Sequence, residues 1–191
     1  ENNPVYAVYF SFNEINLDAS QVSGNNATGN GTNGIFMTGT LLGDSTLGQG
    51  GIPYILVEDD TQLGSLYVPA GSTLTINPGA IFKMTGFGYY DYRGTGLQIA
   101  GELYANGTED APIIFTSIHD DEVVGDTNNN GTATGPTKGD WLSNLIQPGG
   151  SATFDHCTVK YAGGSSYGQT AESIKNDGGT LHFHDGLIDA G

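Results

Sequence analysis

The sequence predicts an all-β protein that forms one parallel β-helix, or β-solenoid, and three observations lead to this prediction. Similar stretches recur along the 191-residue chain, many short strand-like runs alternate with turn residues, and no segment carries a helical stripe of apolar residues. Repeat units of about 20 to 50 residues cannot bury their apolar faces alone, so they stack on one another. We therefore expect a solenoid.

The repeat is clearest in residues 9–19, 153–163 and 182–191, which align without a gap. In each stretch a Phe stands five positions before a β-branched apolar residue. Phe154 and Phe183 occupy the same place in the last two copies, and each of these copies follows a Gly-Gly pair. We expect all three copies to occupy equivalent places in the solenoid.

A second relation suggests shorter coils. The stretch LTINPGAI at residues 74–81 aligns with LQIAGEL at 97–103, which makes Ile76 and Ile99 equivalent positions. Coils of roughly 23 residues, the step between these two positions, predict about seven to eight coils for the whole chain.

The expected strands follow one another at short intervals. They are rich in β-branched or aromatic residues and mostly alternate apolar with polar positions, as half-buried strands do. Gly-Asn, Pro-Gly, Asn-Gly and Gly-Gly pairs between them are typical of turns. The expected strands are residues 5–12, 34–42, 54–57, 65–68, 73–76, 80–84, 96–99, 102–104, 112–117, 142–146, 152–161 and 180–183.

Composition and charge narrow the function classes. The 31 glycines, 14% charged residues and 10% aromatic residues fit a folded chain of short strands rather than a disordered one. A formal net charge of −16 repels nucleic acid and anionic membranes, but it is compatible with divalent cations and neutral glycans. No run of about 18 apolar residues is present, so we expect no membrane span.

The length predicts a single domain over residues 1–191. The sequence starts at Glu1 without a signal peptide and stops within a repeat unit at Gly191. We therefore expect a segment of a longer chain, or a subunit that assembles through open solenoid ends.

Several stretches together carry a family resemblance. They are GSTLTINPGAIFKM at 71–84, GLQIAGELYANGTEDAPIIFTSI at 96–118, GDW at 139–141 and FDHCTVKYAG at 154–163. This pattern resembles the right-handed parallel β-helix repeat regions of large secreted or cell-surface prokaryotic proteins. The resemblance covers about residues 52–191 and implies a right-handed solenoid in an extracellular or cell-surface location. It says little about activity, because β-helices carry lyases, hydrolases, adhesins and inert stalks.

A candidate calcium loop follows the strand at 112–117. Residues 126–131 read Asp-Thr-Asn-Asn-Asn-Gly, which matches the first half of a Ca²⁺ loop with oxygen ligands at alternate positions and Gly at the sixth. Thr137 occupies the twelfth position, where a bidentate Glu belongs, so neighbouring carboxylates would have to supply the missing charge. The alternative is an Asn-Gly-rich surface turn. The candidate ligands are Asp120, Asp121, Asp126, Asn128, Asn130 and Asp140.

A candidate carbohydrate surface combines an aromatic loop with the single Trp. Its residues are Tyr89, Tyr90, Tyr92, Arg93 and Trp141. Exposed aromatic rings stack on sugars while their polar atoms bond hydroxyls. The alternatives are a loop that packs on the adjacent coil and a Trp141 that closes its own loop against the body.

Two further sets of residues are weaker candidates. His182 and His184 lie on one face of a strand, but without a third ligand a surface or stacking role is favoured over a transition metal. Asp155 and Asp185 could provide the two carboxylates of a sugar hydrolase. Such pairs are common in an acidic chain, so catalysis is the less favoured interpretation. Cys157, the single cysteine, is expected to be buried and inert.

These observations lead to one functional hypothesis and two alternatives. We expect a non-catalytic extracellular structural or adhesive solenoid, stabilised by Ca²⁺ and able to assemble end to end into a filament. Its expected partners are a glycan, another surface protein or further copies of itself. The alternatives are a carbohydrate-binding module and, less favoured, a polysaccharide lyase or glycoside hydrolase.

Overall fold

The computed structural model describes residues 6–15, 22–57, 66–86, 95–166, 169–170, 172–189 and 191. All the regular elements within these residues are strands, and no helix occurs among them. The all-β parallel solenoid predicted from the sequence is confirmed.

Most strands line three faces of the solenoid, and all pairings within these faces are parallel. One face consists of β4 (Tyr54–Leu56), β7 (Ile81–Met84), β10 (Ile113–Ser117), β13 (Cys157–Lys160) and β18 (Leu187–Asp189). A second consists of β5 (Leu66–Val68), β8 (Leu97–Ile99), β11 (Asn144–Ile146) and β16 (Ile174–Asn176). The third consists of β3 (Ser45–Leu47), β6 (Thr73–Ile76), β9 (Glu102–Asn106), β12 (Ser151–Asp155) and β17 (Thr180–His184).

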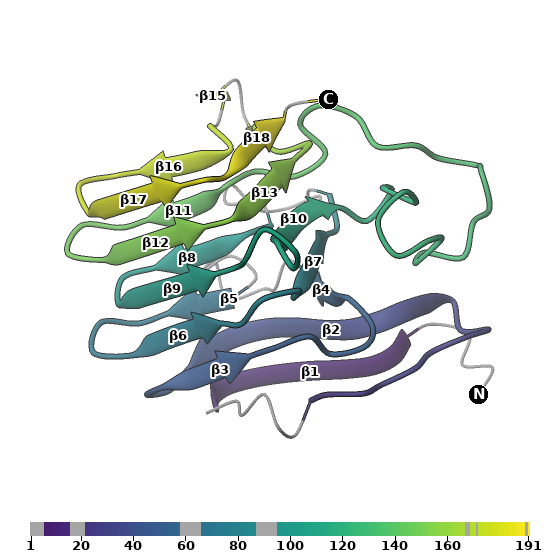
Figure 1. The fold of residues 1–191 in the computed structure, drawn as a ribbon, viewed down its shortest axis with the longest axis horizontal. Coiled ribbons are helices and arrows are strands. Elements are labelled where there is room, and N and C mark those ends of the chain that lie inside the picture. The colour runs from purple at the N-terminus through teal and green to yellow at the C-terminus, as the bar shows by residue number, and fades with distance from the viewer. Residues whose placement is uncertain are drawn as a thin grey trace.

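Four strands complete the fold. The ten-residue β2 (Thr32–Leu41) pairs with β4 through its first half and with β5 through its second half, which joins the first two faces into one sheet. β1 (Tyr6–Ile15) runs parallel to β2, and β14 (Ser165–Ser166) pairs antiparallel with β15 (Gln169–Thr170). Figure 1 shows the coils stacked in chain order, from purple strands at one end to yellow strands at the other.

The solenoid has about five coils, so the prediction of seven to eight was wrong. The step from Ile76 to Ile99 was misleading because it aligned strands from different faces. Leu74 of β6 pairs with Leu103 of β9, one full coil later along the chain, whereas Leu97 of β8 pairs with Leu66. Each coil therefore contains three strands.

The repeat copies at 153–163 and 182–191 are stacked as predicted, with Phe154 opposite Phe183. The copy at 9–19 behaves differently. Its Phe10 pairs with Met37 of β2, so the described residues 9–15 belong to a strand beside the first coil instead of repeating the β12–β13 pattern.

The Gly-Gly pairs mark the corner where the chain enters the third face. Gly149 and Gly178 have φ of 85° and 89°, which side chains rarely adopt. A Cβ on Gly150 would lie 2.3 Å from the Ile99 carbonyl oxygen, and one on Gly179 would lie 2.4 Å from Ile146. The first glycine of each pair makes the turn, and the second leaves room for the preceding coil, with which a Cβ would clash.

The core is a column of side chains that runs along the solenoid. Ring centroids are 5.2 Å apart between Tyr54 and Phe82, 5.1 Å between Phe82 and Phe115, and 6.0 Å between Phe115 and Phe154. Phe183 extends the column, 6.4 Å from Phe154. The first two separations are close to the ~4.8 Å spacing of paired strands, because Tyr54, Phe82 and Phe115 lie on adjacent strands of one face. The Phe115 and Phe154 rings meet edge to face, and each coil contributes one ring to the column.

Candidate functional site

The longest connection in the described chain, residues 118–143, joins β10 to β11 and stands out from the solenoid body (Figure 1). Its beginning covers the outer side of the first face. There Ile118 packs with Phe36 and Ile55 in a small apolar cluster separate from the main core. The loop is therefore attached to the sheet, and the polar residues next to this cluster are shielded from water.

Lys83, on the outer side of β7, is completely buried beneath this loop. Its Nζ donates hydrogen bonds to the Asp120 carbonyl oxygen at 2.8 Å, the Gly125 carbonyl oxygen at 3.2 Å and Thr127 Oγ1 at 2.8 Å. Three bonds use all the protons of an ammonium group. Lys83 thus holds the loop to the sheet from below.

Asp120 supplies negative charge close to this ammonium, and its side chain is also completely buried. Its Oδ2 accepts a hydrogen bond from Thr116 at 2.6 Å and lies 3.4 Å from Lys160 Nζ. Burial lowers the pKa of Lys83 to about 8, although the negative charges of Asp120, Asp121 and Asp126 oppose the shift.

Asp126 folds the predicted calcium loop into a tight turn. Its Oδ1 accepts a hydrogen bond from the Asn130 backbone N–H at 3.1 Å, and its Oδ2 accepts one from the Gly131 N–H at 2.7 Å. The residues in the first and sixth positions of the motif are therefore in direct contact. This contact is what makes the sharp turn expected around Gly131 possible.

The side-chain amides in this loop have a consistent orientation. Asn128 Nδ2 lies 3.2 Å from His119 Nδ1, and Asn130 Nδ2 donates to Thr134 Oγ1 at 2.7 Å. The nitrogen atoms are thus engaged, whereas the Oδ1 atoms of Asn128, Asn130 and Asp121 are buried without a hydrogen-bond partner. Uncharged and charged oxygens of this kind are the ligands that Ca²⁺ prefers.

Asp140, also predicted as a ligand, lies at the base of the loop. Its Oδ2 accepts hydrogen bonds from Ser117 Oγ at 2.6 Å and from the Thr137 N–H at 3.1 Å, and its Oδ1 accepts one from the Thr137 hydroxyl. Asp140 accepts three hydrogen bonds and closes the base of the loop onto β10, whereas each oxygen of Asp126 accepts one bond and keeps a lone pair for an ion. We leave it out of the candidate ligand set.

Of the carbohydrate surface predicted from the sequence, Trp141 alone lies within the described residues. Trp141 is fully buried, and its Nε1 donates to the Lys160 carbonyl oxygen at 2.8 Å. It therefore closes the loop against the body and has no free face for a sugar. Tyr89, Tyr90, Tyr92 and Arg93 lie outside the described residues.

The structure keeps together two pairs of residues that the sequence singled out, and it adds a third residue to one of them. His182 and His184 are exposed, and their rings stack with centroids 6.1 Å apart and planes 6° apart. Asp155 and Asp185 meet at one corner of the solenoid, as their assignment to neighbouring coils suggested. His156, which sequence reasoning did not single out, joins them there.

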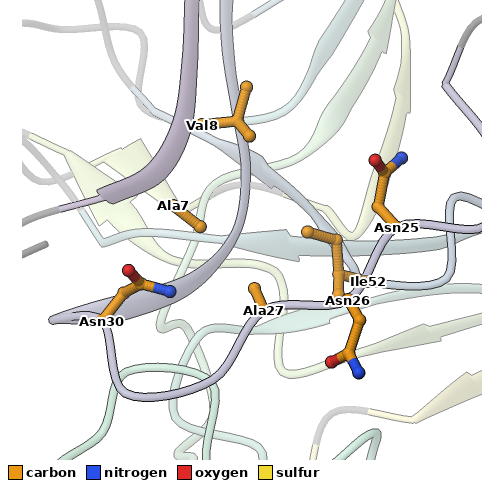
Figure 2. Close-up of a pocket in the computed structure, with 7 residues that line it drawn as sticks. All are labelled: Ala7, Val8, Asn25, Asn26, Ala27, Asn30 and Ile52. Atoms are coloured by element: carbon orange, nitrogen blue, oxygen red, sulfur yellow. The ribbon is translucent and has the colours of Figure 1, made fainter. Parts of the chain in front are cut away.

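A pocket of about 290 Å³ lies near the opposite end of the solenoid (Figure 2). Figure 2 shows its lining residues, which are Ala7, Val8, Asn25, Asn26, Ala27, Asn30 and Ile52. They offer amide groups and apolar surface but no titratable side chain, so we base no catalytic proposal on this pocket.

Comparisons with models of protein families, with curated proteins and with solved structures found no match to this chain. Within the part of the chain that the structure describes, no helix is long and apolar enough to cross a membrane.

Proposed function

We propose that this chain is a non-catalytic structural or adhesive module of an extracellular or cell-surface protein, and that it assembles end to end through its last coil. One observation carries the proposal: the positions that face the core in earlier coils continue into β16, β17 and β18, but there their apolar side chains remain partly exposed. Ile188 is in register with Val159, yet Val159 is completely buried and Ile188 is 50% exposed.

The other strands of this coil show the same loss of burial relative to the preceding coil. Leu181 and Phe183 are in register with the buried Ala152 and Phe154, but they are only partly buried. Each strand of the last coil pairs on one side with the preceding coil and ends its sheet order. Strand edges of this kind are templates for a further strand. A second copy of the chain, stacked on this coil, would pair those backbone groups and cover the exposed apolar residues.

This proposal predicts that particle mass rises with protein concentration. Ile188→Asp should keep the chain monomeric, because it places a charge in the surface to be buried. Sedimentation velocity over a hundredfold concentration range measures the effect. Val124→Asp is the matched control, because Val124 is equally apolar and 55% exposed but lies in the long loop. A constant monomer mass in the unmodified chain, or equal assembly of both variants, would contradict the proposal.

We also propose that Ca²⁺ stabilises the long loop through Asp121, Asp126, Asn128 and Asn130. The buried, unpartnered oxygens of three of these residues support this. Asp120 also has an unpartnered oxygen, but its other oxygen is engaged by Thr116 and Lys160. A set with two carboxylates binds weakly, in the range of about 10⁻⁴–10⁻³ M that suits extracellular modules. This fits the proposed location.

Calcium is expected to raise the melting temperature. At 10 mM Ca²⁺ and a Kd near 1 mM, binding stabilises the folded state by about 1.4 kcal/mol, or a few degrees. Asp121→Asn should remove most of the shift, whereas Asp110→Asn, an exposed residue in another turn, should leave it unchanged. Scanning calorimetry with Ca²⁺, and with Mg²⁺ at equal ionic strength, makes the comparison. A shift of equal size with both ions would indicate screening rather than a calcium site.

A further inference from the structure

Two turns on neighbouring coils stack at the corner between the third and first faces. His156 lies in the turn between β12 and β13, and Asp185 lies in the turn between β17 and β18. Both have left-handed backbone conformations, with φ of 47° and 43°. The His156 N–H donates to the His184 carbonyl oxygen at 3.1 Å, which connects the two turns.

Three side chains meet at this corner. Asp155 Oδ1 lies 2.8 Å from His156 Nδ1. One ligand atom each from Asp155, His156 and Asp185 can be chosen so that all three lie within 4.8 Å of one another. Metal–ligand bonds of about 2.0–2.2 Å place ligand atoms roughly 3–4 Å apart, so small side-chain rotations would complete the geometry.

These side chains are accessible and able to rotate. The side chains of His156 and Asp155 are 32% and 39% exposed, and Asp185 is exposed. His184 is in register with Asp155 on the adjacent strand, so an imidazole stands beside the group. An ion from solvent can therefore reach the corner without any opening of the core.

We propose that Asp155, His156 and Asp185 bind a first-row transition-metal dication, for which Zn²⁺ is the best match, and that the ion clips the last coil to the one before it. An imidazole nitrogen favours such metals over Ca²⁺ and Mg²⁺, which prefer oxygen ligands alone. Three protein ligands plus water is a common zinc arrangement. The inference is independent of the proposed function, because it needs neither assembly nor the calcium loop.

Isothermal titration of ZnCl₂ into the untagged chain, with 10 mM CaCl₂ present to occupy oxygen-only sites, tests the proposal. We expect one Zn²⁺ per chain. His156→Asn and Asp185→Asn should each weaken binding at least tenfold, because each removes a direct ligand or its charge. Asn tolerates the left-handed conformation, so both variants should keep the turn. Asp177→Asn, an exposed acidic residue of the same coil, is the control and should bind as the unmodified chain does.

Amide hydrogen exchange gives a second measurement that does not depend on the variants. Zn²⁺ should slow exchange at the His156 N–H and in β17, because the ion joins the two coils. The proposal fails if the unmodified chain binds no Zn²⁺, or if both Asn variants bind as tightly as it does. Loss of binding in His182→Ala would also overturn it, because that result would place the ion on the stacked histidine pair.

Discussion

Phe82→Ala is expected to lower the free energy of unfolding by about 3–5 kcal/mol, the range measured when a large buried aromatic side chain is truncated. Phe82 is completely buried in β7, which lies between β4 with Tyr54 and β10 with Phe115. Its ring contacts both neighbours in the aromatic column. Truncation would leave a cavity. The rings of Tyr54 and Phe115 belong to the two neighbouring coils, so they cannot move in to fill it.

Urea unfolding followed by circular dichroism measures this effect as a lower midpoint. Tyr104→Ala is the control, because it removes an aromatic ring of similar size from the outer side of β9, where Tyr104 is 41% exposed. The control should cost less than about 1 kcal/mol. Similar losses in the two variants would contradict an inward column as the main source of stability.

A change in the slope of unfolding would be informative as well. Each coil of a solenoid contacts only its neighbours, so a weak coil can uncouple the two ends. If the Phe82→Ala transition broadens or splits, the coils on either side of β7 unfold separately. A single sharp transition would instead show that the remaining contacts keep the whole stack of coils cooperative.

The fold was predictable because its signals are local and repeated. Alternating residues defined the strands, Gly-Gly pairs defined one corner, and the spacing between Phe154 and Phe183 gave the true coil length. The coil count failed because strands from different faces share one pattern of alternation. Leu74 and Leu97 look equivalent in sequence, and only the pairing of each with its own partner separates the two faces.

The candidate metal site at the corner was within reach of the same reasoning. His156 and Asp185 are separated by the same interval as Phe154 and Phe183, so the coil length alone places them in equivalent turns. Asp155 and Asp185 were paired in this way, but His156, which shares the turn with Asp155, was not included with them.

The surroundings of Lys83 could not be predicted in this way. Alternation in Ile81–Met84 places Lys83 on the outer side of β7, which normally means exposure to solvent. It is buried because a loop much further along the chain folds over it and supplies oxygen acceptors. Contacts between residues so far apart have no local signal in the sequence.

Lys83→Met is the second change with a large expected effect, about 3 kcal/mol of destabilisation at pH 7. The substitution leaves the Asp120 carbonyl oxygen and the Thr127 hydroxyl without the Lys83 donor, and the Gly125 carbonyl oxygen keeps its bond from Thr127. The Asp120 carboxylate keeps its ion pair with Lys160. Losing one member of a buried charged network typically costs about 3–5 kcal/mol, part of which is recovered here because an apolar side chain replaces a desolvated ammonium. Chemical unfolding of both proteins at pH 7 measures the difference.

The pH dependence separates a buried ammonium from simple packing. The pKa of Lys83 falls from 10.5 to about 8 on folding, so between these values the unfolded chain binds more protons. Stability from this group therefore rises with pH, by about 1.6 kcal/mol between pH 8 and 9.5, and Lys83→Met should lack that rise. The pKa values of Tyr54 and Cys157 are raised by burial to about 12, which lowers stability at high pH, but equally in both proteins. The gap between the two proteins should thus widen above pH 8. Parallel pH profiles would mean that the ammonium is hydrated when folded and that the loop does not depend on it.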